Sequence, residues 1–123
     1  MRRALLVLAL ALAGVGLFAG SLAWVLNDPR PPAGASHGER LYVAYCAGCH
    51  GLNGRGSWRA ALFLIRPGDL TVAADHPDQY VFDMIKHGGA SIGRPGMPAF
   101  GAQLSDEEIR TLVAYVETLA RPR

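Results

Sequence analysis

The amino-terminal run from Ala4 to Leu26 constrains this chain more than any other feature, because none of its 23 residues is charged. As an α-helix, such a run is roughly 34 Å long, enough to cross the hydrocarbon core of a bilayer. Export signals have an apolar stretch of about 7–15 residues, so the length favours a retained transmembrane helix over residues 1–26. Arg2-Arg3 predicts a cytoplasmic amino terminus and a carboxy-terminal domain on the periplasmic side of a single-pass cytoplasmic-membrane protein. Ser21-Leu22-Ala23 resembles a cleavage site, so a removed signal remains an alternative, and both interpretations imply export.

The charge balance excludes one class of partner. The chain has 12 Lys+Arg and 10 Asp+Glu, and without Arg2 and Arg3 the count is 10 against 10. No basic stripe remains to hold phosphates, so we expect no nucleic-acid partner. Residues 27–35 read NDPRPPAGA and predict a proline-rich linker with a reach of roughly 28 Å. Residues 36–123 are left for one domain, which is small enough to need a stabilising element beyond its apolar core.

The pattern of residues 36–123 predicts an all-α domain, because no segment reads as a sustained strand. Ser36 and Glu39 form a capping box, as do Ser105 and Glu108, and each box predicts the start of a helix. The predicted helices cover residues 37–47, 60–65, 75–87 and 106 onward, with loops at 52–57 and 88–101. The expected buried faces are Tyr80, Val81, Met84 and Ile85 on one helix, and Ile109, Leu112, Val113, Val116 and Leu119 on the last, which Arg121 follows.

The two cysteines of the chain lie in Cys46-Ala47-Gly48-Cys49-His50, which is the attachment pattern for c-type haem. Two intervening residues space the thiols for the two vinyl groups of one porphyrin, and the following histidine can offer a nitrogen to the iron. A thioredoxin-like site would need a βαβ context, and a structural zinc site would need four ligands. A plain disulfide would leave His50 unexplained. We therefore predict one covalent haem c, bound through Cys46 and Cys49, with His50 as an iron ligand.

The opposite face of the iron needs its own ligand, and the candidates are Met84, Met97, His37, His76 and His87. Met97 lies in a loop rich in glycine and proline, which lets the backbone approach a ring and fixes its direction there. Met84 fits a helix core, and His87 fits a helix carboxy terminus. We predict Met97 as the second axial ligand, because His/Met ligation suits a haem that carries electrons.

Together, CAGCHG, the following G-x-G loop, Gly96-Met97-Pro98-Ala99-Phe100 and the amphipathic last helix resemble a class I monohaem c-type cytochrome of the membrane-anchored bacterial type. The resemblance implies a small cytochrome c fold of three to four helices around one haem, preceded by one transmembrane helix. It implies a crossing of the first and last helices at Gly38, Tyr42, Leu112 and Tyr115. It also implies that the carbonyl of Pro67 accepts a hydrogen bond from His50.

The resemblance implies a single-electron carrier and not an enzyme, with no small-molecule substrate. Its expected partners are the membrane and redox proteins, namely a quinol-oxidising complex and a terminal oxidase or reductase, or it is a fixed subunit of such a complex. Arg55, Trp58 and Arg59 are candidates for contacts with haem propionates, although packing and surface roles are equally open. Lys86 is the one lysine, so the docking face is not the lysine ring of mitochondrial-type cytochromes c. The alternative is a haem enzyme or gas sensor with a displaceable sixth ligand.

Overall fold

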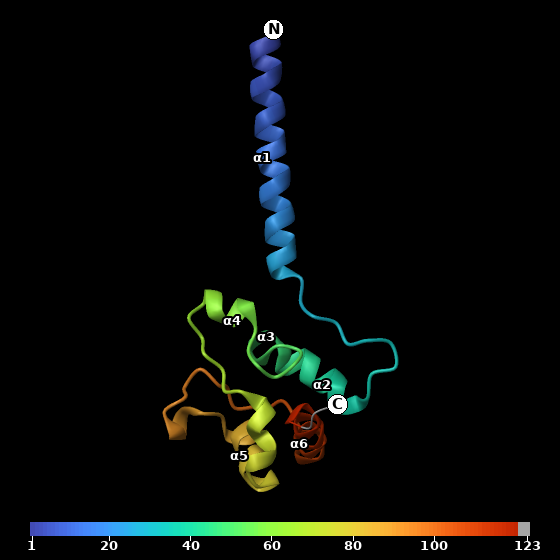
Figure 1. The fold of residues 1–123 in the computed structure, drawn as a ribbon, viewed down its shortest axis with the longest axis vertical. Coiled ribbons are helices and arrows are strands. Elements are labelled where there is room, and N and C mark those ends of the chain that lie inside the picture. The colour runs from blue at the N-terminus through green and yellow to red at the C-terminus, as the bar shows by residue number, and fades with distance from the viewer. Residues whose placement is uncertain (121–123) are drawn as a thin grey trace.

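The computed structural model describes residues 1–120 as a long amino-terminal helix followed by a small helical domain (Figure 1). The described chain contains no strand, which confirms the predicted all-α class. Its elements in order are α1 (Arg2–Leu26), α2 (His37–Tyr45), α3 (Ala47–His50), α4 (Trp58–Leu62), η1 (Leu70–Asp75), α5 (Asp78–His87), η2 (Ala90–Ile92) and α6 (Asp106–Ala120).

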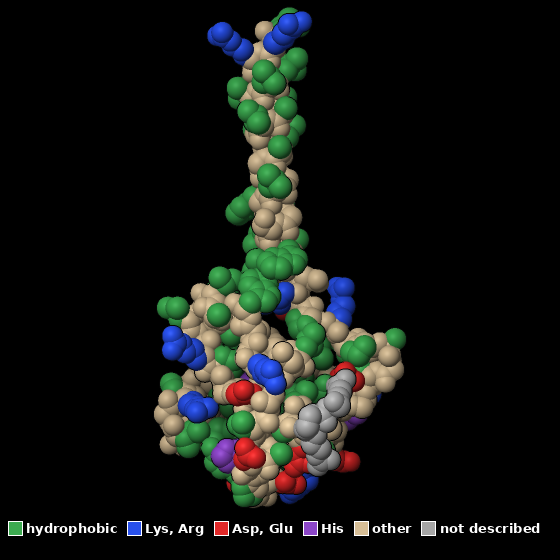
Figure 2. All heavy atoms as spheres, viewed as in Figure 1, with side chains coloured by type: hydrophobic (Ala, Val, Ile, Leu, Met, Phe, Trp, Pro, Cys, Tyr) green, Lys and Arg blue, Asp and Glu red, His purple; other side chains and the backbone are tan. Residues whose placement is uncertain are grey.

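Helix α1 extends away from the domain and contacts it only near its last turn, and none of its residues is buried (Figures 1 and 2). Among residues 1–120 it is the one helix that is long and apolar enough to cross a membrane. The linker that follows is not fully extended, because the chain turns at Gly34 (φ +82°) and the Ala35 N–H donates to the Pro32 carbonyl over 3.1 Å. Arg40 also donates to the carbonyl of Ala35, so the end of the linker is fixed to α2.

The core of the domain is the predicted crossing of α2 and α6. Gly38 makes the close approach possible, since a Cβ there would lie 2.9 Å from the Thr111 carbonyl oxygen and 3.0 Å from Tyr115 Cβ. The rings of Tyr42 and Tyr115 pack with centroids 5.2 Å apart, and Tyr42 is fully buried. The buried face of α6 comprises Ile109, Leu112, Val113 and Val116, as its sequence predicts, with Leu119 partly buried.

Local hydrogen bonds explain where the helices begin. Ser105 and Glu108 form both halves of their capping box: the Ser105 N–H donates to Glu108 Oε2 over 2.8 Å, and the Glu108 N–H donates to Ser105 Oγ over 3.3 Å. Ser36 Oγ accepts from the Glu39 N–H over 3.1 Å. Helix α4 begins two residues before the predicted turn because Ser57 Oγ caps it through the Ala60 N–H. Arg121, expected after the last helix, lies outside the described residues.

Several features differ from the sequence prediction. Helix α5 begins at Asp78 and not at residue 75, and η2 lies within the predicted loop at residues 88–101. The first predicted helix is divided at Cys46 into α2 and α3. The element η1 was not predicted, and it starts where Asp69 Oδ1 accepts the N–H of Thr71 over 2.8 Å. Helix α5 buries Phe82 together with Ile85, whereas Tyr80 is exposed and its ring packs at a tilt against that of His76, with centroids 4.9 Å apart. The apolar face of α5 is therefore rotated relative to the prediction.

Candidate haem site

Cys46 lies at the junction between α2 and α3, where the chain turns without leaving helical geometry. Its N–H donates to the Tyr42 carbonyl over 2.8 Å, and its carbonyl accepts from the Cys49 and His50 N–H groups over 3.1 and 2.8 Å. The two thiols are therefore carried by one short turn, and both are free and partly buried. Burial, and secondarily the neighbouring Cys49, raises the pKa of Cys46 to about 12, so this thiol is neutral at pH 7.

The loop that follows His50 folds back and holds this turn in place. The N–H groups of Gly56 and Ser57 donate to the carbonyls of His50 and Cys49 over 2.7 and 2.9 Å, which satisfies the open end of α3. Gly51 is required here, since it has φ +72° and a Cβ would lie 2.6 Å from the Gly56 carbonyl oxygen. The G-x-G pattern at residues 54–56 therefore supports the turn that carries the two thiols.

His50 is oriented by a single hydrogen bond: its Nδ1 lies 3.0 Å from the carbonyl oxygen of Gly68. Burial lowers the pKa of His50 below its usual value of 6.5, although the Gly68 carbonyl acts in the opposite direction. The ring is therefore neutral at pH 7. A neutral ring that donates from Nδ1 carries its lone pair on Nε2, the atom that would bind a metal.

The prediction that the carbonyl of Pro67 accepts this hydrogen bond is wrong by one residue. The segment before η1 is non-helical, and Asp69 has extended dihedral angles. Successive carbonyls of an extended chain point to opposite sides, so only one of two neighbours can face the imidazole. That carbonyl belongs to Gly68, whereas Cγ of Pro67 lies 3.7 Å from the position of a Cβ on Gly56.

Met97 is held by the carboxy-terminal end of α5. Gly88 ends that helix at φ +76°, and a Cβ there would lie 2.8 Å from the Met97 carbonyl oxygen. The Gly89 N–H donates to the same carbonyl over 3.0 Å, and the Met97 N–H donates to Arg94 O over 3.1 Å. Met97 is partly buried and packs against the core. Its backbone is held by hydrogen bonds to Gly89 and Arg94, and its side chain is held by the core.

The Met97 loop lies beside the segment that orients His50. A Cβ on Gly68 would lie 2.7 Å from Arg94 Nη1, and a Cβ on Gly96 would lie 4.0 Å from Ile65 Cγ2. Arg94 lies three positions before Met97 in the sequence. Its guanidinium lies next to Gly68, whose carbonyl accepts the hydrogen bond from His50. The fold thus brings the loop that carries Met97 next to the segment that orients His50, although the two predicted ligands are 47 residues apart in the sequence.

The other candidate ligands occupy ordinary structural positions. Met84 is partly buried on α5, and His37, His76 and His87 are exposed. Two candidates for propionate contacts are engaged elsewhere: Trp58 stacks on Trp24, and Arg59 binds the linker. Arg55 is exposed, and its charge helps to lower the pKa of Asp69 after the hydrogen bonds from Thr71.

The donor set of the site fits a c-type haem better than a metal ion bound by side chains alone. No group of three or more His, Cys, Asp or Glu side chains that could hold a metal ion occurs among residues 1–120. A structural zinc site needs four ligands, whereas a haem iron needs only two from the protein. The paired thiols, the neutral His50 imidazole and the methionine loop supply what haem c requires.

The sequence did not indicate that Tyr42 holds the chain directly after the Cys46–His50 motif. Tyr42 Oη donates to the Gly51 carbonyl oxygen over 2.6 Å, so a buried side chain of α2 holds the residue directly after His50. The resemblance gave Tyr42 a role only in helix packing. No local pattern marks such a bond, because it depends on how far the loop folds back toward α2.

Comparison with known proteins agrees with this geometry. Residues 33–116 match the family described as cytochrome c oxidase, cbb3-type, subunit III. The cbb3-type cytochrome c oxidase subunit FixP of Azorhizobium caulinodans is 31% identical over 91 residues, which cover 74% of this chain and 29% of FixP. The chain therefore spans less than a third of the length of that relative. With the match over most of its length, this chain belongs to the cbb3-type cytochrome c oxidase subunit III family, as a membrane-anchored c-type cytochrome with a role in electron transport.

Proposed function

We propose that the chain is a single-electron carrier with one haem c attached through Cys46 and Cys49, and with His50 and Met97 as the axial ligands. The observation that carries the proposal is the contact between the Met97 loop and the segment that orients His50, through Arg94 and Gly68. This proximity supports the assignment of His50 and Met97 to one site. A site of this kind transfers electrons with little rearrangement.

Each protein group has a defined task in this proposal. When bound, haem c supplies an iron that takes up and releases one electron. Gly68 holds the His50 ring in one tautomer and increases its basicity toward a metal. Gly88 and Gly89 hold the Met97 backbone, and the thioether at that position favours the reduced state. The Cys46 turn and the loop at residues 51–57 keep the attachment points rigid.

We further propose that α1 tethers the domain to the periplasmic face of the cytoplasmic membrane. Arg2 and Arg3 are the first residues of α1, before its apolar run, which supports a cytoplasmic amino terminus. FixP is by its name a subunit of a cbb3-type cytochrome c oxidase, which supports a terminal oxidase as the partner of this chain. The chain serves either as a subunit of such a complex or as a tethered carrier that delivers electrons to it from a quinol-oxidising complex.

The test is the absorption spectrum of the haem-loaded full chain in mild detergent. We expect a ferric low-spin spectrum with a sulfur-to-iron charge-transfer band, which Met97→Ala abolishes. Met84→Ala is the matched control, because Met84 is also a partly buried methionine, and it should keep the band. Intact mass should show haem retained after denaturation. A high-spin ferric spectrum in the unchanged chain would support the haem enzyme or gas sensor instead, and a band lost only in Met84→Ala would contradict the assignment.

A further inference from the structure

The short helix α4 ends in an apolar tip, Leu62-Phe63-Leu64, that the domain does not bury. These side chains are 62%, 73% and 90% exposed. Leu64 also has φ +57°, and it is the one non-glycine residue among residues 1–120 with a positive φ. Leu64 is the left-handed residue that closes α4, because the Leu64 N–H donates to the Ala61 carbonyl over 3.1 Å and the Ile65 N–H donates to the Ala60 carbonyl over 2.8 Å. The tip is therefore an ordered end of a helix with its apolar side chains left exposed.

The apolar tip lies next to the end of the membrane-spanning helix. Trp58, the first residue of α4, stacks on Trp24 in the last turn of α1, with ring centroids 4.6 Å apart and planes inclined by 14°. Tryptophan near the end of a transmembrane helix marks the level of the lipid headgroups. Because α4 has only five residues, roughly 8 Å of helix, its end remains close to that level.

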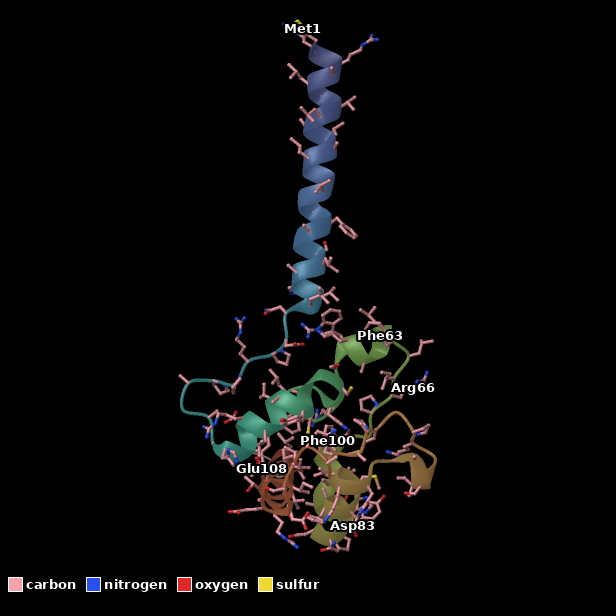
Figure 3. All side chains as sticks on the ribbon, turned by 180° about the vertical axis from the view of Figure 1, so that it is seen from behind. Met1, Phe63, Arg66, Asp83, Phe100 and Glu108 are labelled. Carbon is pink, nitrogen blue, oxygen red and sulfur yellow. The ribbon has the colours of Figure 1, made fainter. Side chains whose placement is uncertain are left out.

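Arg59 fixes α4 in this place through the chain that leaves α1. Its guanidinium donates to Asp28 Oδ1 over 3.2 Å and to the Trp24 carbonyl over 3.4 Å, and it also contacts the Asn27 carbonyl. The Arg59 side chain is only 19% exposed, although the Asp28 side chain that it binds is 91% exposed. Figure 3 shows Phe63 on the side of the domain nearest α1, and Figure 2 shows hydrophobic side chains continuing from α1 onto the domain.

We propose that the apolar tip enters the interfacial layer of the lipid bilayer and forms a second membrane contact beside α1. The occupant is lipid because the tip is continuous with the end of a membrane-spanning helix. Apolar residues flanked by arginines are typical of segments that lie in this layer, and Arg59 and Arg66 flank the tip. Arg66 is exposed and free to approach anionic headgroups. This contact would orient the haem site relative to the membrane plane, and it does not depend on Met97 being a ligand.

The test uses the purified, haem-loaded full chain, one copy per nanodisc of phosphatidylcholine and phosphatidylglycerol that carry a diazirine in the acyl chain. After illumination, mass spectrometry maps the lipid adducts. We expect adducts in residues 2–26 and a second group in residues 58–66, with none in α5. Changing Phe63→Asp and Leu64→Asp together should reduce the second group about tenfold, since two apolar side chains lose their burial, while adducts on α1 stay unchanged.

Tyr80→Asp is the matched control, because Tyr80 is an exposed aromatic residue on α5, away from α1, and it should leave both groups unchanged. The haem spectrum and the thermal midpoint of each variant show that the domain remains folded. Adducts confined to residues 2–26 in the unchanged chain would overturn the proposal. So would equal labelling of residues 58–66 in the double variant, or labelling that appears only when a partner complex shares the nanodisc.

Discussion

Gly88 offers the sharpest test of how the fold places Met97. Gly88 and Gly93 have nearly the same φ, +76° and +75°, but different surroundings. A Cβ on Gly93 would meet nothing within 4 Å, whereas a Cβ on Gly88 would lie 2.8 Å from Met97 O and 2.9 Å from Ala99 N. The comparison of Gly88→Ala with Gly93→Ala therefore measures the loop contact, together with the less favourable ψ of Gly88, against the cost of a positive φ in an open position.

The expected magnitudes follow from the dihedral angles and the contacts. Gly93 is in the left-handed helical region (ψ 18°), where alanine costs about 1 kcal/mol. Gly88 has ψ −179°, a region that is essentially restricted to glycine and costs alanine about 1–3 kcal/mol. Displacing two backbone atoms of the Met97 loop adds about 1–3 kcal/mol. Gly88→Ala should therefore lower the free energy of unfolding by about 1–5 kcal/mol more than Gly93→Ala.

The assay is guanidinium unfolding of the haem-loaded full chain in detergent. Haem absorbance is followed because it reports the domain and not α1. Gly88→Ala should also weaken the sulfur-to-iron band before global unfolding, since the atoms that must move belong to the methionine loop. If the two variants differ by less than about 0.5 kcal/mol, the loop is not held by this contact and the reasoning is refuted.

Two further predictions test the supports of the site. Tyr42→Phe should lower the free energy of unfolding by about 1–2 kcal/mol, because the Gly51 carbonyl loses the hydroxyl that donates to it over 2.6 Å. Tyr45→Phe is the control: its ring is exposed, and it should leave the free energy of unfolding unchanged in the same assay. The Ser105 N–H and hydroxyl lower the pKa of Glu108, so its contribution to stability is present above its unfolded value of 4.5 and is lost as pH falls through the lower folded value. The thermal midpoint should therefore fall less between pH 7 and pH 3 in Glu108→Gln than in the unchanged chain.

Most features of the fold that could be predicted depend on residues within about one helical turn of each other. The capping box at Ser105 and Glu108 and the apolar stripe of α6 depend on residues three or four apart, and the structure confirms both. The crossing at Gly38 followed from a family resemblance, and the close contacts of that glycine agree with it. The attachment motif itself is a local pattern, so its position at the end of α2 could also be expected.

What the sequence could not show depends on backbone direction and on contacts between distant segments. Whether Pro67 or Gly68 faces His50 is decided by dihedral angles between the loop at residues 51–57 and η1, and neither residue type specifies them. The bond from Tyr42 to Gly51 likewise depends on how the loop folds back. The linker composition indicated a spacer, but Arg59 brings α4 against its first residues, a contact across more than 30 positions.

The ion pair of Lys86 affects how fast this protein associates with its partners. Its ammonium lies 2.7 Å from Asp106 Oδ1, so the one lysine of the chain is neutralised within its own domain. Beyond α1 the positive and negative side chains are equal in number. Long-range attraction toward a partner is therefore weak, and association should proceed near the rate of roughly 10⁵–10⁶ M⁻¹s⁻¹ typical of neutral pairs. Added salt should change that rate little, in contrast to a carrier that is steered by charge.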